Sequence, residues 1–330
     1  MTDLLQQLIA LPSPSREEGA AADFLESRLR QYGLAPKRSG NNLWCVKGSG
    51  PAVLVDAHTD TVKPAPGWRR DPFRPVLEDG KLYGLGSNDD GGSLVALIHF
   101  FLQAEPRKHT LVLSLSAEEE VSGHGGLEQA LPLMEADAGP FCCGIIGEPT
   151  GMQLAVSERG LLVLDCESAG IAGHAARADG INAIYEALPD IAWFRENGMQ
   201  VTQIEAGTQH NVIPDRCRFV VDVRTVRDNT AVLARIQEHV KCRVTPRSTR
   251  LHGSTIAPSH PLVKAARSLG IPAFDSPTLS NQALCRFPTV KLGPGESARS
   301  HSADEYILLR EVEEAVPLYL KLWQAYENLG

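Results

Sequence analysis

The chain has 330 residues, of which 43% are apolar and 22% charged, and its formal net charge is -8. These values are typical of a globular protein with one large domain or two ordinary ones. The acidic balance argues against nucleic acid and anionic membranes as main partners. The seven cysteines include no CxxC pair, so we expect neither a disulfide framework nor a cysteine zinc site.

The N-terminus, MTDLLQQLIALPSPS, lacks the basic and long apolar regions of a signal peptide. The longest apolar run, SLVALIHFFL, is about 10 residues, which is too short to span a bilayer. We therefore expect a cytoplasmic protein.

The first half of the chain reads as alternating helices and buried strands. Ser15 and Glu18 form a capping-box pattern, which predicts a helix over residues 19–33. Continuous apolar runs that end in polar residues predict strands of an α/β sheet. The expected strands cover residues 41–48, 52–61, 109–120 and 142–150, with a helix over 91–106.

The pattern changes after residue 156 and returns near 254. The middle part reads as β-α-β-β-α-β, with strands at 161–168, 199–207, 217–225 and 241–246 and helices at 180–194 and 230–240. This order predicts a ferredoxin-like insert at 157–253. A helix at 261–270, a strand at 288–295 and a helix from about Glu311 complete an α/β domain made of 1–156 and 254–330.

Residues suited to metal binding stand at the expected carboxyl ends of strands, where ligands gather in open α/β sheets. They are His58, Asp89, Glu120, Glu148 and, near the C-terminus, His301. The first four are spaced by 31, 31 and 28 residues, about one α/β unit each. Two imidazoles and three carboxylates exceed one tetrahedral zinc site and suit two metals about 3.5–4 Å apart that share a carboxylate.

Three consecutive glutamates, Glu118, Glu119 and Glu120, repel one another unless cations neutralise them. Because strand-end side chains alternate, one glutamate can bind metal while its neighbour accepts a proton from water. The glutamate that has neither of these two roles is expected to be solvated.

Each of these features also has a plain structural interpretation. A lone histidine at a strand end is usually a hydrogen-bonded structural residue, and a run of glutamates is usually a solvated turn. The sequence GLGSND lacks the third glycine of a phosphate loop and precedes carboxylates, which repel phosphate. The joint occurrence of the motifs in this order, rather than any one of them, favours a metal centre.

Nearly the whole chain resembles the M20 peptidases, a co-catalytic zinc group that includes acetylornithine deacetylase, succinyl-diaminopimelate desuccinylase and carboxypeptidase G2-like enzymes. The motifs that carry the resemblance are HTDTVKP, WRRDPFRPVLEDGKLYGLGSNDDGG, AEEEVSGHGG, GEPT, GHAAR, GINAI, GTQHNVIPD and GPGESARSHSADEY. The resemblance implies a di-zinc aminopeptidase-like catalytic domain interrupted by a lid domain that commonly mediates dimers.

The resemblance also implies a role for each matched residue. His58 and Glu148 would bind one zinc, Glu120 and His301 the other, and Asp89 would bridge them. Cobalt could replace zinc. Asp60 would fix the tautomer of His58, and Glu119 would be the general base.

Three matched residues lie in the expected lid. His174 would help to stabilise the oxyanion, often from the partner subunit, and Asn211 and Arg224 would contact substrate. Arg177 and Arg299 are spare cations near the matched motifs that could hold a succinyl carboxylate. One departure stands out: Asp90 and Gly91 follow the bridging aspartate, where relatives often have an apolar residue and lysine.

The stretch SPTLSNQALCRFPTVKLGPGESARSHSADEYI looks most like the acetylornithine deacetylase branch. We therefore expect removal of an acetyl or succinyl group from the α-amine of ornithine or a related amino acid, in arginine or lysine biosynthesis. One alternative is an M20 dipeptidase or carboxypeptidase with the same centre. Another is a non-catalytic M20-like protein that serves for binding or dimerisation.

Overall fold

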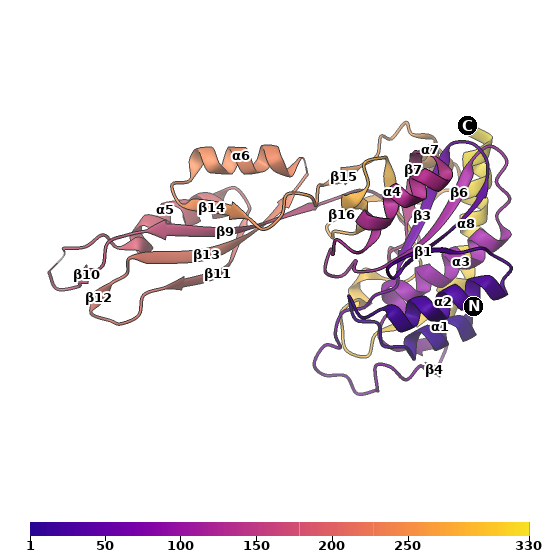
Figure 1. Cartoon of the computed structure of the whole chain (residues 1–330), viewed down its shortest axis with the longest axis horizontal. Helices are drawn as coiled ribbons and strands as arrows, with labels where there is room; N and C mark the ends of the chain where they lie inside the picture. The colour runs from indigo at the N-terminus through magenta and orange to yellow at the C-terminus, as the bar shows by residue number, and fades with distance from the viewer. Residues whose placement is uncertain (178, 227, 330) are drawn as a thin grey trace. The chain divides into compact units, whose positions relative to one another are not determined.

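The computed structural model describes residues 1–177, 179–226 and 228–329. The chain divides into two compact units, which are drawn with all their elements in Figure 1. Unit 1 comprises Met1–Ser157, Thr255–Ser276 and Ser280–Gly330, and unit 2 comprises Glu158–Ser254 with Pro277–Leu279. The predicted insertion points, 156/157 and 253/254, lie within one residue of these boundaries, whereas the grouping of Pro277–Leu279 with unit 2 was not expected.

A nine-stranded mixed sheet forms the centre of unit 1, in the order β1-β2-β6-β3-β7-β17-β8-β15, with β16 also paired to β8. The strands are β1 (Lys37–Ser39), β2 (Asn42–Gly48), β3 (Ala52–His58), β6 (Thr110–Ser116), β7 (Phe141–Ile146), β8 (Leu154–Glu158), β15 (Ser254–Thr255), β16 (Ala273–Ser276) and β17 (Thr289–Lys291). The four central strands, β6, β3, β7 and β17, are parallel to one another. Their carboxyl ends therefore meet at one edge, and the prediction of an α/β fold with a central sheet is confirmed.

Helices cover both faces of this sheet, because every residue of β3 and β6 is buried and neither face can meet water. They are α1 (Thr2–Ile9), α2 (Gly19–Gln31), α3 (Gly92–Gln103), α4 (Leu127–Ala138), α7 (Pro261–Ser268) and α8 (Leu309–Leu329). One apolar core includes residues of α1, α2, α3, α7 and α8, and a second, on the other face, includes α4. Within the described residues, no helix is long and apolar enough to cross a bilayer.

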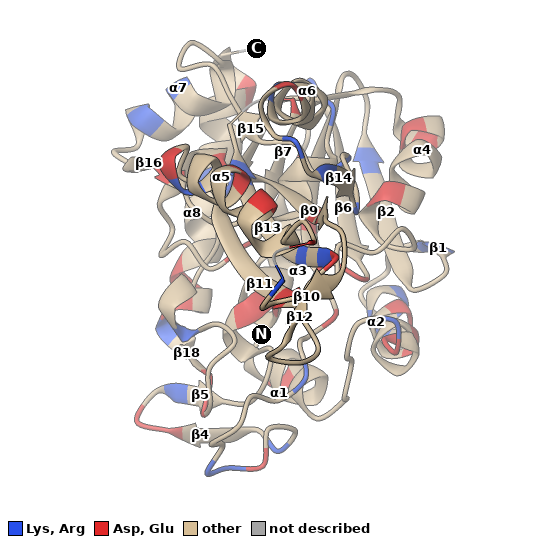
Figure 2. Ribbon diagram, turned by 90° about the vertical axis from the view of Figure 1, so that its left-hand side faces the viewer, with Lys and Arg blue, Asp and Glu red and all other residues tan. Residues whose placement is uncertain are grey.

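The helix α2 shows how sequence pattern selects the buried face. Ala21, Ala22, Leu25 and Leu29 recur at helical spacing and are buried. Both acidic and basic residues lie on the remaining surface of the helix (Figure 2). The same segment corrects one prediction, since no side chain caps the helix at its N-terminus. The capping box is wrong because Ser15 and Glu18 bind elsewhere, as described below.

Unit 1 also has a small antiparallel sheet in the order β18-β5-β4. Its strands are β18 (Tyr306–Leu308), β5 (Lys81–Tyr83) and β4 (Val76–Glu78). Strand β18 follows the predicted ligand His301, and β5 precedes the loop that carries Asp89. Their pairing therefore ties together two segments that are far apart in sequence.

Unit 2 is a four-stranded antiparallel sheet in the order β11-β13-β9-β14. Its main elements are β9 (Gly160–Ala169), α5 (Ala183–Glu196), β11 (Gln200–Ala206), β13 (Arg216–Thr225), α6 (Asn229–His239) and β14 (Arg243–Pro246). This order of elements and strands is that of a ferredoxin-like sandwich. Alternate residues of β9 and β13 are buried in a core of their own with Phe194 of α5 and Ile236 of α6. Two short strands, β10 (Gly173–His174) and β12 (Val212–Ile213), pair outside the main sheet.

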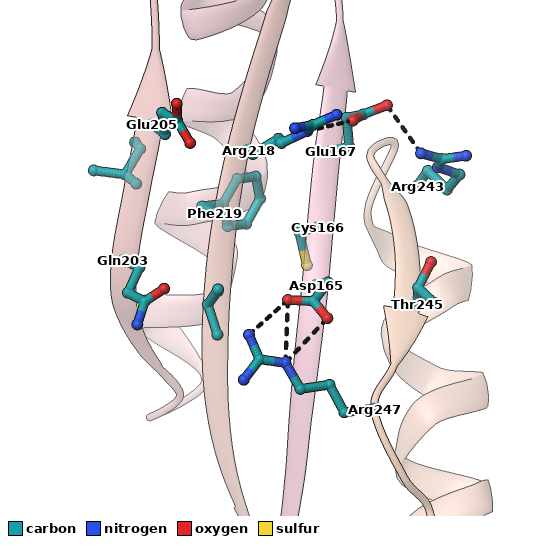
Figure 3. Close-up of a pocket in the computed structure, with 12 residues that line it drawn as sticks. Asp165, Cys166, Glu167, Gln203, Glu205, Arg218, Phe219, Arg243, Thr245 and Arg247 are labelled. Atoms are coloured by element: carbon teal, nitrogen blue, oxygen red, sulfur yellow. Dashed lines mark hydrogen bonds and ion pairs between the residues drawn. The ribbon is translucent and has the colours of Figure 1, made fainter.

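The four strands of the main sheet of unit 2 line a hollow of about 550 Å³, and many of the side chains that face it are charged (Figure 3). The Glu167 carboxylate accepts hydrogen bonds from Arg218 at 2.9 Å and from Arg243 at 3.0 Å. Two guanidinium nitrogens of Arg247 donate to the Asp165 carboxylate. The guanidinium groups are about half exposed or more, so these ion pairs add little to the stability of the unit.

Candidate metal centre

The end of β3 supplies the first part of the site. His58 is the last residue of the strand and is 3% exposed. Its Nδ1 faces the main-chain carbonyl oxygen of Asp60 at 2.9 Å and the Asp60 carboxylate at 3.5 Å. Nδ1 therefore carries the proton, and Nε2 is left to bind a metal.

Asp89 stands opposite His58, with its Oδ1 3.2 Å from Nε2 of the imidazole. The loop that carries Asp89 is held by Glu305, which lies four residues after His301 and is buried. The Glu305 carboxylate accepts from three main-chain N–H groups, those of Gly86 at 3.2 Å, Asn88 at 2.9 Å and Asp89 at 3.0 Å. Glu305 thus fixes the loop without entering the site.

The three consecutive glutamates follow β6. The main-chain N–H groups of Glu119 and Glu120 donate to the two carboxylate oxygens of Asp60, at 3.0 and 3.1 Å. Glu118 was expected to be solvated, and this is wrong. Its carboxylate is half-buried, faces Arg16 at 3.7 Å and lies against Gly123, where a Cβ atom would collide with it. The glycines that follow the acidic run therefore make room for Glu118.

His301 completes the cluster from the other end of the chain. Its Nε2 lies 3.0 and 2.9 Å from the two carboxylate oxygens of Glu120 and 3.6 Å from Oδ2 of Asp89. Asp89 thus lies between the two histidines. There are two groups of three residues in which the donor atoms lie within 4.8 Å of one another. One group comprises His58, Asp89 and Glu120, and the other comprises His58, Glu119 and Glu148.

The ionisation of these groups shows how crowded the negative charge is. Burial raises the pKa of Glu119 well above its usual range, and the charges of Glu120, Asp60 and Asp89 add to this effect. Burial likewise raises the pKa of Glu148, although the cation of Lys291 opposes the shift. Carboxylates that are driven towards the neutral form by one another are stabilised as anions when cations bind among them.

The surrounding carboxylates favour the charged form of the two histidines, whereas they favour the neutral form of Glu119. Burial would lower the pKa of His58, but its hydrogen bonds with Asp60 and Asp89 outweigh burial and raise it well above its usual range. The hydrogen bond to Glu120 raises the pKa of His301 to about 9. Two imidazoles and several oxygen donors within reach of one another fit divalent metals such as zinc.

Asp90, the departure noted in the sequence, is 1% exposed. It lines a cavity of about 30 Å³ to which His58 and Asp60 of the site also contribute. Burial raises the pKa of Asp90 well above its usual range.

The predicted lid residues all belong to unit 2, and the structure brings only two of them together. The main chain of Asn211 accepts from the N–H of Ala175, next to His174, and β10 pairs with β12 there. Arg216, at the start of β13, is the residue of that strand nearest in sequence to β12. Arg224 lies eight residues further along β13, about 26 Å at the rise of a strand. Its guanidinium already binds Asp222 at 2.9 and 3.2 Å.

Arg299 is not a spare cation, because it forms a bidentate ion pair with Glu311 at 2.7 and 3.0 Å. The sequence reasoning also missed four buried or half-buried residues that hold the site's main chain, namely Ser15, Glu18, Asn42 and Glu305. The signal was present for Ser15 and Glu18, but it was assigned to helix capping.

A parallel-sheet edge that gathers imidazoles and carboxylates, with a further carboxylate beside them, defines the class of a metal-dependent hydrolase. The model of peptidase family M20/M25/M40 matches residues 54–325 of this chain. The chain belongs to this family.

Solved structures share the fold over nearly the whole chain. Aminopeptidase PepT from Bacillus cereus has a TM-score of 0.81 at 20% identity and covers 98% of this chain and 97% of its own. A metallo-carboxypeptidase of family M20 from Sulfolobus solfataricus has a TM-score of 0.78 at 15% identity, with 99% of each chain covered. The Bacillus subtilis YXEP protein, a dinuclear metal-binding peptidase of family M20, has a TM-score of 0.73 at 15% identity over 99% and 96% of the two chains. At these identities the likeness shows the fold alone.

Proposed function

We propose that this protein is a di-zinc amidohydrolase that removes an acetyl or succinyl group from the α-amine of ornithine or a related amino acid. The observation that carries the amidohydrolase part is the convergence of His58, Asp89, Glu120 and His301 around Glu119 and Glu148. The choice of an N-acyl amino acid is supported by the likeness of residues 276–307 to acetylornithine deacetylases. Arginine or lysine biosynthesis would be the setting.

His58 and Glu148 would hold one metal, Glu120 and His301 the other, and Asp89 would bridge them. When bound, two zinc ions would supply a polarised substrate carbonyl and a water of lowered pKa. Cobalt could take the place of zinc. The fit of the donor set supports this assignment, as does the dinuclear metal binding of the YXEP protein.

Glu119 would act as the general base. Its carboxylate is half-buried beside the donor set, and its main chain is fixed by Asp60. It would accept a proton from the attacking water and deliver it to the nitrogen of the departing amine. His174 would donate a hydrogen bond to the carbonyl oxygen as negative charge develops there. Asn211 would contact the substrate close to His174, and Arg224 would bind its carboxylate after releasing Asp222. Because Arg224 lies far along β13 from the other two, it and the pair of His174 and Asn211 would come from different protomers of the homodimer. Unit 2 would serve as the lid and as the contact in a homodimer.

A peptidase is the second candidate, and it is supported by the names of solved structures with a similar fold, which include an aminopeptidase and a carboxypeptidase. The same centre would cut a dipeptide if the free amine or carboxylate of the peptide were recognised. A non-catalytic binding protein is the third candidate, and metal content separates it from both enzymes.

The test is amine release from zinc-loaded and cobalt-loaded protein with N-acetylornithine, N-succinylornithine, N-acetylcitrulline and several dipeptides in parallel. We expect one acylated amino acid to dominate and about two metals per chain. Cleavage of dipeptides alone would replace the deacylase with the peptidase. A protein that takes up no metal and cuts nothing would be a binding protein.

A further inference from the structure

We propose that Ser13, Ser15 and Glu18, here called the N-terminal clamp, are positioning residues that hold the general base Glu119 and the ligand Glu120 in place. The clamp precedes α2 and is about 100 residues from the acidic turn in sequence. The inference rests on the proposed function, because it assigns a support to that function's base.

The clamp is first fixed to the chain that leaves β3. Ser13 Oγ donates to the carbonyl oxygen of Thr59 at 3.0 Å, and the N–H of Thr61 donates to the carbonyl oxygen of Ser13 at 2.9 Å. These bonds place Ser15 beside Asp60, to which its hydroxyl donates at 2.7 Å. Ser15 therefore acts on the one carboxylate that binds both His58 and the acidic turn.

Asp60 transmits this constraint. One of its oxygens accepts from the N–H of Glu119, and the other accepts from both Ser15 and the N–H of Glu120. A carboxylate with both oxygens engaged has one rotamer in which all partners are satisfied. Loss of the Ser15 hydroxyl leaves this second oxygen with the N–H of Glu120 as its remaining partner, so the carboxylate is held less firmly and the turn gains freedom to rotate.

Glu18 holds the preceding residue of the turn. It is 0% exposed, and its Oε1 accepts from the N–H of Arg16 at 2.7 Å and from the N–H of Glu118 at 3.1 Å. Its Oε2 accepts from Asn41 at 3.0 Å. Every partner of Glu18 is a donor, so a glutamine there must direct its NH2 group at one of them.

Two buried carboxylates thus receive all three N–H groups of the acidic run. This arrangement matters because Glu118 has a φ of 56°, a left-handed conformation that a glutamate adopts only when its surroundings hold it. The next two side chains must then project into the donor set. Displacement of a catalytic group by about 1 Å costs on the order of a hundredfold in rate.

The experiment compares Glu18→Gln and Ser15→Ala with the wild-type protein, Ser15→Thr as the rescue, and Glu17→Gln as the control. Glu17 is the exposed neighbour of Glu18, so its substitution makes the same change of charge without touching the turn. Three quantities are measured: kcat and KM with the best substrate, bound zinc per chain, and hydrogen exchange of the peptide 113–126.

We expect Glu18→Gln and Ser15→Ala to lower kcat roughly tenfold to a hundredfold, with KM within about twofold, as for other supports of catalytic groups. Amides 118–120 should exchange at least about tenfold faster in both variants, while Ser15→Thr and Glu17→Gln match the wild type. The clamp is rejected if exchange at 118–120 is unchanged in Ser15→Ala. It is also rejected if the loss of kcat disappears once rates are scaled to the folded fraction. If the wild type cuts none of the substrates, the proposed function fails, and the exchange result still decides the clamp.

Discussion

At the scale of single residues, the centre depends on carboxylates that never enter it. Asp60, Glu18 and Glu305 are buried, and each accepts hydrogen bonds from main-chain N–H groups of the turns that carry the ligands. A carboxylate in this position satisfies buried donors and also turns the neighbouring side chains towards the metals. The acidic run is therefore ordered by other acids behind it.

Glu119→Gln tests the base directly. The amide keeps the shape of the side chain but cannot accept the proton of water, so kcat should fall by about 10² to 10⁴. Bound zinc should stay at the wild-type level, because the predicted ligands are untouched. Steady-state kinetics and metal analysis decide this, with Glu313→Gln on the exposed side of α8 as the control. A rate equal to that of the wild type would remove Glu119 from the mechanism.

Cys142 and Cys143 offer a test of pH dependence outside the centre. The hydrogen bond from Cys143, with another from Tyr326, lowers the pKa of the Cys142 thiol to about 6. Cys142 should therefore be a thiolate above about pH 6. Its alkylation by iodoacetamide, followed by mass spectrometry, should rise through pH 6 and level off near pH 7. In Cys143→Ala the donor is absent, so the midpoint should move upward, and a wild-type midpoint near pH 9 would contradict this view.

At the scale of elements, the sequence was informative where a single run of residues decides the structure. The strands β3 and β6 are mostly apolar and end in polar residues, so both their burial and the position of His58 could be predicted. The pattern of Ser15 and Glu18 misled, because a local helix cap and a distant main-chain contact need the same residue types. Arg224 matched a motif, but its ion pair with Asp222 depends on the alternation along β13, which motif comparison ignores.

Helix α3 should be the element whose packing matters most for unit 1. Phe100 is 1% exposed and lies against Tyr319 and Trp323 of α8, with ring centroids 5.7 and 6.2 Å away. Phe100→Ala should lower the free energy of unfolding by about 3–5 kcal/mol through lost burial and a cavity. Urea unfolding followed by circular dichroism measures this, and Leu133→Ala at an exposed position of α4 should change it by less than about 0.5 kcal/mol. Equal effects of the two substitutions would show that α3 does not anchor the core.

At the scale of the whole molecule, each unit has a hydrophobic core composed of its own residues. All the predicted metal ligands belong to unit 1, whereas His174, Asn211 and Arg224 belong to unit 2. Both sets could be proposed from the sequence because their motifs are local. It could not identify the acyl group, because a pocket for it depends on how side chains from distant segments meet.

This division predicts that metal stabilises one unit and not the other. A ligand that binds only the folded state adds about 2.7 kcal/mol at a hundredfold excess over its Kd, and that gain belongs to the unit that holds the site. Scanning calorimetry of the intact chain should therefore show two transitions, of which zinc raises one and EDTA lowers the same one. Phe219→Ala, in the core of unit 2, should lower only the other transition. If zinc and Phe219→Ala moved a single common transition, the two cores would unfold as one cooperative unit, and the effect of metal would extend to the unit that carries His174.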